Sequence, residues 1–283
     1  MLDYFSRTDF ARRTRVLDLD GKKGMSIQVG LEFLYNAASM PDVKLYESYL
    51  QRLQVLLAAE WGEFPPAFVR SRIANSRLLL LAWDGGELVG FSAMSLKHVC
   101  DRLVHYIEFA IVRRQYEPTG VSGKLVYSLL KDAFLSNVRY NRRLSLELAF
   151  ITANVRTLSN LAKYAGFLYP NPSCCDKQTG RVPKADDLTW AVAQELIKQS
   201  DRPGRTLKRE GCVLLNSYEA MPWLVDGLVR QSKNSDERLS LFAQRYLDYR
   251  RREGREFVVR AVIRPSSLAR FALTETLGLP ETQ

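Results

Sequence analysis

The sequence is poor in the two residue types that most often bind metals or form disulfides. Among its 283 residues are four cysteines and two histidines. Cys174 and Cys175 are adjacent, and His98 and His105 do not complete a metal-ligand spacing with them. So few cysteines in a chain of this length give no disulfide framework. We therefore expect neither a metal site nor a disulfide-stabilised fold.

Long apolar runs are also absent. The longest uninterrupted run, residues 78–83, is far shorter than the roughly 20 apolar residues that cross a bilayer. Residues 1–15 contain no continuous apolar segment of the kind found in signal peptides. We expect no transmembrane segment and a cytoplasmic location.

Acidic residues are outnumbered by basic ones. The 31 Asp and Glu residues face 41 Lys and Arg residues, which gives a formal net charge of +10. This excess favours anionic partners such as small-molecule phosphates, nucleic acid, an acidic protein or a membrane surface. It does not choose among them, and an ordinary solvated basic surface explains the same number.

Apolar periodicity divides the rest of the chain into helices and strands. The helical segments are expected at residues 45–59, 65–73, 121–135, 154–165 and 236–252. The strands are expected at residues 26–34, 78–83, 88–94, 103–112, 144–151 and 257–263. Two of these strands flank the turn Asp84-Gly85-Gly86-Glu87 and predict a hairpin.

The clearest candidate site is the glycine-bearing loop that joins strand 103–112 to helix 121–135. It contains Gly120 and is followed by Gly123. Such a turn exposes backbone N–H groups at a helix N-terminus, which can bind a pyrophosphate. Glycine lets the main chain approach a phosphate with no side chain between them. Three basic residues add positive charge to the segment: Arg113, Arg114 and Lys124.

This segment resembles the phosphate-binding loop of the GNAT superfamily of acetyltransferases, whose motif is Gln/Arg-x-x-Gly-x-Gly/Ala. The matching positions run from Glu117 to Ser122, with Gly120 at the first glycine, and Leu125 also fits. Two positions depart from the motif, because Glu117 replaces a basic or amide residue and Ser122 replaces a second small residue. Glu117 would repel a phosphate if it faced one, a repulsion that Arg113 or Arg114 could offset.

The segment that follows is similar to a second part of the same family. Asn154 and the Gly166-Phe167 pair match the pattern, although Asn154 stands one residue early. Ala162 occupies the position where many relatives carry a tyrosine that acts as a general acid. Three nearby residues are alternatives for protonating the departing thiolate: Tyr164, Ser159 and Tyr169.

The resemblance implies an acyl-CoA-dependent N-acyltransferase, with acetyl-CoA as the expected donor and an amine of unknown class as the acceptor. Glu108 is the first candidate for the base, Glu147 the second and His105 the third. The Glu108 carboxylate can equally face solvent or form an ion pair. The backbone N–H of Ile111 or Val112 would face the thioester oxygen. The implied cofactor-binding residues are Ile111, Val112, Arg113, Arg114, Thr119, Gly120, Val121, Ser122, Gly123, Lys124 and Asn154, and the catalytic pair is Glu108 and Tyr164.

The resemblance also implies the fold, an α/β (α+β) domain with a mixed, largely antiparallel sheet flanked by helices. We expect an N-terminal arm over residues 1–24, the acyltransferase domain over 25–200 and a C-terminal α+β extension over 205–283. Residues 200–204 have the composition of a linker.

Two further functions stay open from the sequence. The domain can be a degenerate GNAT fold that binds nucleic acid or a protein partner, which Glu117 and Ala162 favour. It can also be an acyltransferase that acts on a nucleic acid or on a protein bound to one. Whether the domain still binds the acyl-CoA cofactor distinguishes an enzyme from the degenerate fold.

Overall fold

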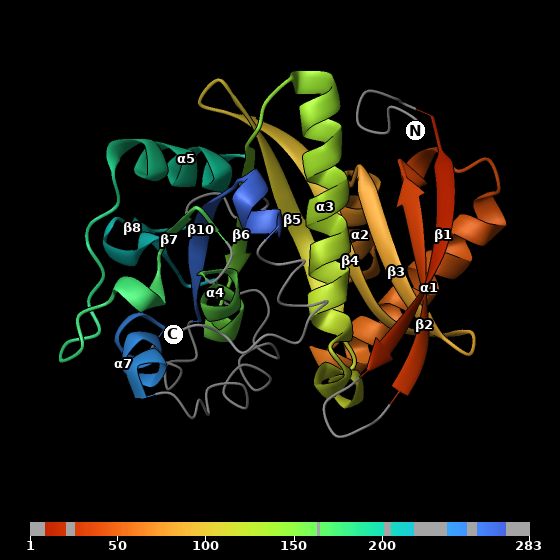
Figure 1. Ribbon diagram of the computed structural model, residues 1–283, viewed down its shortest axis with the longest axis horizontal. Helices are drawn as coiled ribbons and strands as arrows, with labels where there is room; N and C mark the ends of the chain where they lie inside the picture. The colour runs from red at the N-terminus through yellow and green to blue at the C-terminus, as the bar shows by residue number, and fades with distance from the viewer. Residues whose placement is uncertain are drawn as a thin grey trace. The chain divides into compact units, whose positions relative to one another are not determined.

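The computed structural model describes residues 9–20, 26–162, 165–200, 205–217, 237–247 and 254–269. The chain divides into two units (Figure 1). The first takes in residues 1–96 and 105–144, and the second takes in residues 97–104 and 145–283.

The strands of the first unit follow one another in space in the order of the sequence. They are β1 (Ala11–Asp20), β2 (Ser26–Tyr35), β3 (Leu78–Asp84), β4 (Glu87–Val99) and β5 (Arg102–Val112). Their order is β1-β2-β3-β4-β5, and the pairs from β1 to β4 are antiparallel. Apolar residues line both faces of β3, and its Leu78–Ala82 segment is buried because helices cover both sides.

Two-residue turns connect the last three of these strands. Gly85 and Gly86 have φ angles of 52° and 88°, and Cys100 and Asp101 have φ angles of 49° and 58°. Positive φ at both central residues is the geometry whose twist matches a hairpin. The hairpin predicted at residues 84–87 is therefore confirmed.

Helices cover both faces of this sheet (Figure 1). Helices α1 (Val43–Glu60) and α2 (Pro66–Ala74) lie on the face that carries Leu34 and Leu81, and they share a hydrophobic core with it. Helix α3 (Val121–Asn141) lies on the other face, where its Asp132 accepts a hydrogen bond from the Tyr35 hydroxyl at 2.9 Å. Tyr35 and Leu34 are adjacent on β2 and point to opposite faces because side chains alternate along a strand.

The second unit has its own strands and helices. In chain order they are β6 (Leu146–Thr152), α4 (Val155–Ala162), β7 (Phe167–Tyr169), α5 (Asp187–Lys198), β8 (Leu207–Lys208), β9 (Val213–Leu215), α7 (Glu237–Tyr246) and β10 (Arg255–Ile263). Short 3₁₀ turns, η3 (Pro172–Cys174) and η4 (Glu210–Cys212), lie between them. Strand β10 pairs antiparallel with β6, β7 and β9, so it is the central strand of this unit.

The expected fold class is confirmed, because the described strand pairs are antiparallel and helices flank the strands. The structure places two segments differently from the sequence prediction. Residues 11–20 of the expected N-terminal arm form β1, which pairs with β2 along its whole length. Residues 257–263 of the expected C-terminal extension pair with residues 146–152 of the expected acyltransferase domain. The unit boundaries therefore differ from the expected boundary near residue 200, because β10 returns to an earlier strand.

None of the helices within the described ranges has both the length and the apolar character needed to span a bilayer.

Candidate functional site

Helix α3 begins immediately after β5 and the 3₁₀ turn η2 (Arg114–Thr119). Gly120 precedes the helix with φ 82° and ψ 3°, a left-handed conformation that glycine adopts without strain. The first N–H groups of a helix have no partner within it, and in the described part of the chain no side chain caps this helix. The start of α3 therefore offers the N–H groups of Val121, Ser122 and Gly123 to an external acceptor.

The start of α3 is also open on its outer side. Gly120 and Ser122 are exposed, whereas Thr119 and Val121 are buried. A β-carbon added to Gly120 would meet no described atom within 4 Å. The two buried residues anchor the helix start, and the two exposed ones leave space for a ligand at its N-terminus.

Gly90 on β4 lets α3 begin close to the sheet. A β-carbon at this position would come within 2.9 Å of Leu125 Cδ1 and Val112 Cγ2, and within 3.0 Å of the Ile111 carbonyl oxygen. A larger residue would push the first turn of α3 away from the end of β5. Gly90 thus brings the end of β5 and the start of α3 into contact, which the sequence did not reveal.

Hydrogen bonds hold η2 in place next to the start of α3. The Tyr116 hydroxyl donates to the Asp84 carboxylate at 2.7 Å, and this bond raises the pKa of Tyr116. The Thr119 hydroxyl donates to the Tyr116 carbonyl, also at 2.7 Å. The hydroxyl of Thr119, expected to contact a cofactor, thus has a partner within η2.

The two arginines at the beginning of η2 have different surroundings. Arg113 Nε donates to the Leu88 carbonyl at 3.2 Å, and its guanidinium forms an ion pair with Glu87 at 2.9 Å. Arg113 therefore joins the end of β5 to the beginning of β4. Arg114 and Glu117 are both exposed, so positive and negative charge lie on the same turn. Lys124 lies half-buried in the first turn of α3.

Glu108, the first candidate for the base, lies in a buried ion pair. Its Oε2 pairs with the guanidinium of Arg72 on α2, and its Oε1 accepts from the Ser95 hydroxyl at 2.6 Å. The Glu108 side chain is 2% exposed, although the residue as a whole is half-buried because its main chain is more open. Both carboxylate oxygens thus have partners, and an amine or a water would have to reach a second lone pair of one oxygen, or replace one of these contacts, before a proton could move.

The other two candidate bases are also enclosed. In the second unit, Glu147 accepts from Arg102 at 2.9 Å and from two nitrogens of Arg260, each at 3.1 Å. Arg260 also donates to the Thr189 hydroxyl at 3.1 Å, so this carboxylate belongs to a network that joins β6, β10 and α5. His105 on β5 is 2% exposed.

The downstream candidates lie in the second unit. The Asn154 side-chain oxygen accepts from the Arg156 N–H at 3.0 Å and so satisfies the start of α4. The Tyr169 hydroxyl donates to the Pro183 carbonyl at 2.9 Å and accepts from the Gly211 N–H at 3.0 Å, while burial raises its pKa. Tyr169 therefore joins β7 to η4 and does not have a free hydroxyl. Tyr164 lies outside the described residues.

The structure shows contacts near the site that sequence reasoning missed. No local sequence motif marks Arg72, Ser95 or Gly90, and the residues that they contact are far away in the sequence. A positive residue on a predicted helix face and a small residue on a predicted strand are too common to single out. Within the described ranges, no three His, Cys, Asp or Glu side chains gather in a way that could hold a metal ion.

Comparison with solved structures finds acetyltransferases of the GNAT type. Naa50 of Arabidopsis thaliana, solved with a bisubstrate analogue, is 17% identical, with a TM-score of 0.35 over 43% of this chain and 81% of that one. An acyl-CoA N-acyltransferase of Pseudomonas aeruginosa is 14% identical, with a TM-score of 0.36 over 48% and 86%. The GNAT-family protein YhbS of Escherichia coli, solved with CoA, is 16% identical, with a TM-score of 0.32 over 55% and 69%.

No family model and no curated protein matches the chain.

Proposed function

We propose that this protein is an N-acyltransferase that uses an acyl-CoA, with acetyl-CoA as the expected donor, and transfers the acyl group to an amine. The observation that carries the proposal is the uncapped start of α3 at Gly120, directly after β5 and open on its outer side. A helix N-terminus with this opening binds a phosphate or pyrophosphate. The loop motif around Gly120 supports CoA as the molecule that carries it.

The residues at this helix start fit such a group. The N–H groups of Val121, Ser122 and Gly123 would hold the pyrophosphate, and the helix dipole favours its negative charge. Arg114 is exposed and can add a cation, and Lys124 lies one turn into α3. Glu117 is exposed on η2 and would oppose an anion that came near it. When bound, an acyl-CoA supplies an acyl group activated as a thioester.

The end of β5 would position the reacting groups. The backbone N–H of Ile111 or Val112 would face the thioester oxygen, and the contact between these residues and Gly90 sets the place of the strand end. Glu108 would take the proton of the attacking amine, directly or through a water. The Ser95 hydrogen bond orients its carboxylate, and the Arg72 contact would be exchanged when the amine binds. Asn154 and Tyr164 remain candidates for cofactor binding and thiolate protonation.

Thermal unfolding with acetyl-CoA, CoA and ATP tests the donor. A ligand at 100 times its dissociation constant adds about 2.7 kcal/mol of stability, so acetyl-CoA and CoA should raise the melting temperature more than ATP does. Release of free CoA thiol from acetyl-CoA in the presence of a panel of primary amines then tests the transfer. Equal effects of all three ligands would contradict a specific CoA site.

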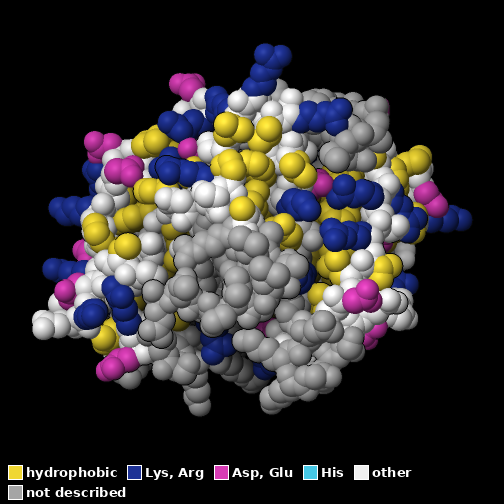
Figure 2. All heavy atoms as spheres, viewed as in Figure 1, with side chains coloured by type: hydrophobic (Ala, Val, Ile, Leu, Met, Phe, Trp, Pro, Cys, Tyr) yellow, Lys and Arg dark blue, Asp and Glu magenta, His cyan; other side chains and the backbone are white. Residues whose placement is uncertain are grey.

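A second function is favoured by the charges around the same site. Glu117 on the loop and the enclosed carboxylate of Glu108 fit a degenerate GNAT fold that binds a partner without catalysis. On the face shown in Figure 2, described Lys and Arg side chains lie beside apolar and acidic ones. Stabilisation by an oligonucleotide, with an affinity that falls steeply with salt, would favour this binding function over acyl transfer.

A further inference from the structure

A pocket lies in the second unit and is lined by residues that the sequence analysis did not assign to a site. Its volume is about 410 Å³, within the range of pockets that take small molecules. It is lined by α7, by strands β8 and β9, by η4, by the first residue of β10 and by a loop residue. The lining residues are Thr179, Lys208, Glu210, Val213, Leu215, Leu241, Gln244, Arg245, Tyr246 and Arg255.

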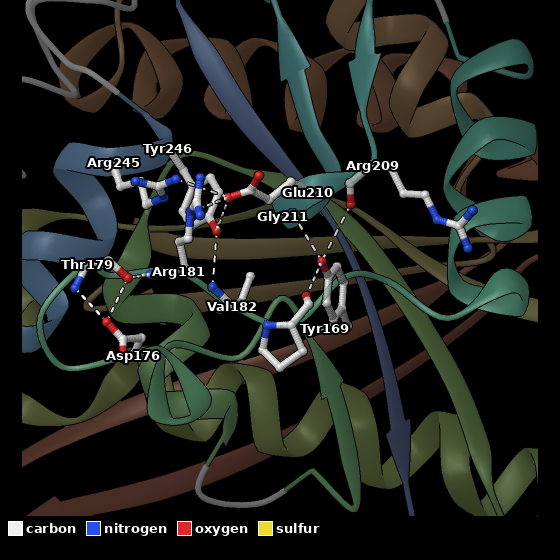
Figure 3. A network of polar contacts seen from close by, with 11 residues as sticks. Tyr169, Asp176, Thr179, Arg181, Val182, Arg209, Glu210, Gly211, Arg245 and Tyr246 are labelled. Carbon is white, nitrogen blue, oxygen red and sulfur yellow. Dashed lines mark hydrogen bonds and ion pairs between the residues drawn. The ribbon is translucent and has the colours of Figure 1, made fainter.

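The single carboxylate of the lining, Glu210, already has cationic partners. Its Oε1 lies 3.3 Å from the Arg245 guanidinium and 3.5 Å from Nε of Arg181. The Tyr246 hydroxyl donates to the same oxygen at 3.2 Å. Figure 3 shows Arg181 and Arg245 beside this carboxylate. Two arginines, Arg181 and Arg245, therefore already balance the negative charge of Glu210.

Two further cations, Arg255 and Lys208, line the pocket. Arg255 donates through Nη1 to the Tyr246 carbonyl at 3.4 Å, at the C-terminus of α7. Lys208 is exposed on β8. Over the part of the chain that the structure describes, neither Lys208 nor Arg255 has a carboxylate within ion-pair distance. Together with Arg245, they leave the pocket with more positive than negative charge.

Apolar side chains make up another part of the lining. Val213 and Leu215 come from β9, and Leu241 comes from α7. Val213 is 2% exposed, so it belongs to the inner part of the pocket. The pocket thus combines an apolar surface with cations that lack counterions, which is the arrangement that suits a ligand with an apolar body and an anionic end.

We propose that this pocket binds a small organic anion, a carboxylate or a phosphate monoester that carries an apolar group. The anionic end is held by Lys208 and Arg255, and the apolar group lies against Val213, Leu215 and Leu241. The site shares no residue with the start of α3, because its lining belongs to the second unit and α3 belongs to the first. It provides the chain with a second ligand site beyond the proposed acyltransfer.

Isothermal titration with paired probes tests the charge requirement. The anions are benzoate, hexanoate and phenyl phosphate, and the matched neutral probes are benzamide and hexanamide. We expect at least one anion to bind with one-to-one stoichiometry and its neutral counterpart to bind at least tenfold more weakly. The titrations are run with and without saturating CoA, which should leave the affinity unchanged. Failure of all three anions, equal binding of the neutral probes, or competition by CoA would overturn the proposal.

Substitutions then test the place of binding. Lys208→Gln removes an exposed charge from a two-residue strand and should weaken binding of the anion at least tenfold, because it removes a charge-assisted hydrogen bond. Arg255→Gln should do the same, and its melting temperature reports any loss of the Tyr246 contact. Lys184→Gln is the matched control, since Lys184 is exposed in the same unit but does not line the pocket. Unchanged affinity in Lys208→Gln, or an equal loss in Lys184→Gln, would refute the assignment.

Discussion

Arg72 on α2 and Glu108 on β5 are 36 residues apart in the sequence and form an ion pair whose side chains are 9% and 2% exposed. The Arg72 guanidinium also lies 5.1 Å from the centre of the Phe68 ring, and Ser95 donates to the second oxygen of Glu108. These contacts join α2 to the two strands that precede the proposed phosphate site. The same carboxylate is the candidate base, so its structural and chemical roles have to be separated by experiment.

Arg72→Met should lower the free energy of unfolding by about 3–5 kcal/mol, because it leaves the Glu108 charge buried without its partner. Urea unfolding measures the change. The double variant Arg72→Met/Glu108→Gln should lose less than the sum of the two single losses, since it removes both charges. As a control, Arg70 lies on the same helix as Arg72 and forms an exposed ion pair with Glu47 of α1, so Arg70→Met should change stability little. Additive losses in the double variant would show that the two side chains do not depend on each other.

Glu108→Gln should lower turnover by about 100-fold or more, the usual contribution of a general base. Its affinity for CoA should stay within about twofold, because the amide keeps the shape of the side chain and no CoA phosphate is expected there. Steady-state kinetics and a CoA titration measure the two effects. Glu147→Gln serves as the comparison, since it alters the second candidate carboxylate. A turnover loss confined to Glu147→Gln would transfer the role of base to that residue.

Gly120→Asp should weaken CoA binding at least tenfold, because the carboxylate would lie at the uncapped start of α3 and repel the phosphates. Gly120→Asn is its matched control, since Asn and Asp have the same shape and both tolerate a positive φ. The two variants should unfold at similar temperatures, because the position is open and both residues cap helices well. Equal CoA affinity in the two variants would remove the charge argument for this site.

Two of the four thiols should react with a disulfide reagent in the native protein at pH 8, and all four in denaturant. Cys100 and Cys174 are exposed, whereas Cys175 and Cys212 are buried. Burial raises the pKa of Cys212 to about 12, so the reactive thiolate is scarce at pH 8 and increases only as the pH rises toward that value. Spectrophotometric counting of released thiolate measures the reaction. The variant Cys100→Ser/Cys174→Ser should show no fast phase, and a fast phase in it would contradict the described burial.

The sequence by itself determined the features that depend on neighbouring residues. Glycine at 85, 86 and 120 predicted the hairpin turn and the start of α3, because a positive φ is a property of the residue and its immediate chain. Apolar periodicity predicted most helices and strands, and the loop motif indicated an anion site between a strand and a helix.

The tertiary structure decided the contacts between distant residues. That Glu108 pairs with Arg72, that Tyr169 bonds to Pro183 and Gly211, and that β10 pairs with β6 depends on how the chain returns to itself. The conformational preferences of neighbouring residues do not specify such contacts, because the free energy that selects a distant partner comes from burial and hydrogen bonding in the folded chain. Residues 11–20 were expected to be an arm because their charged sequence does not by itself predict a strand. They form β1 by pairing with β2, which is a contact between segments and not a local property.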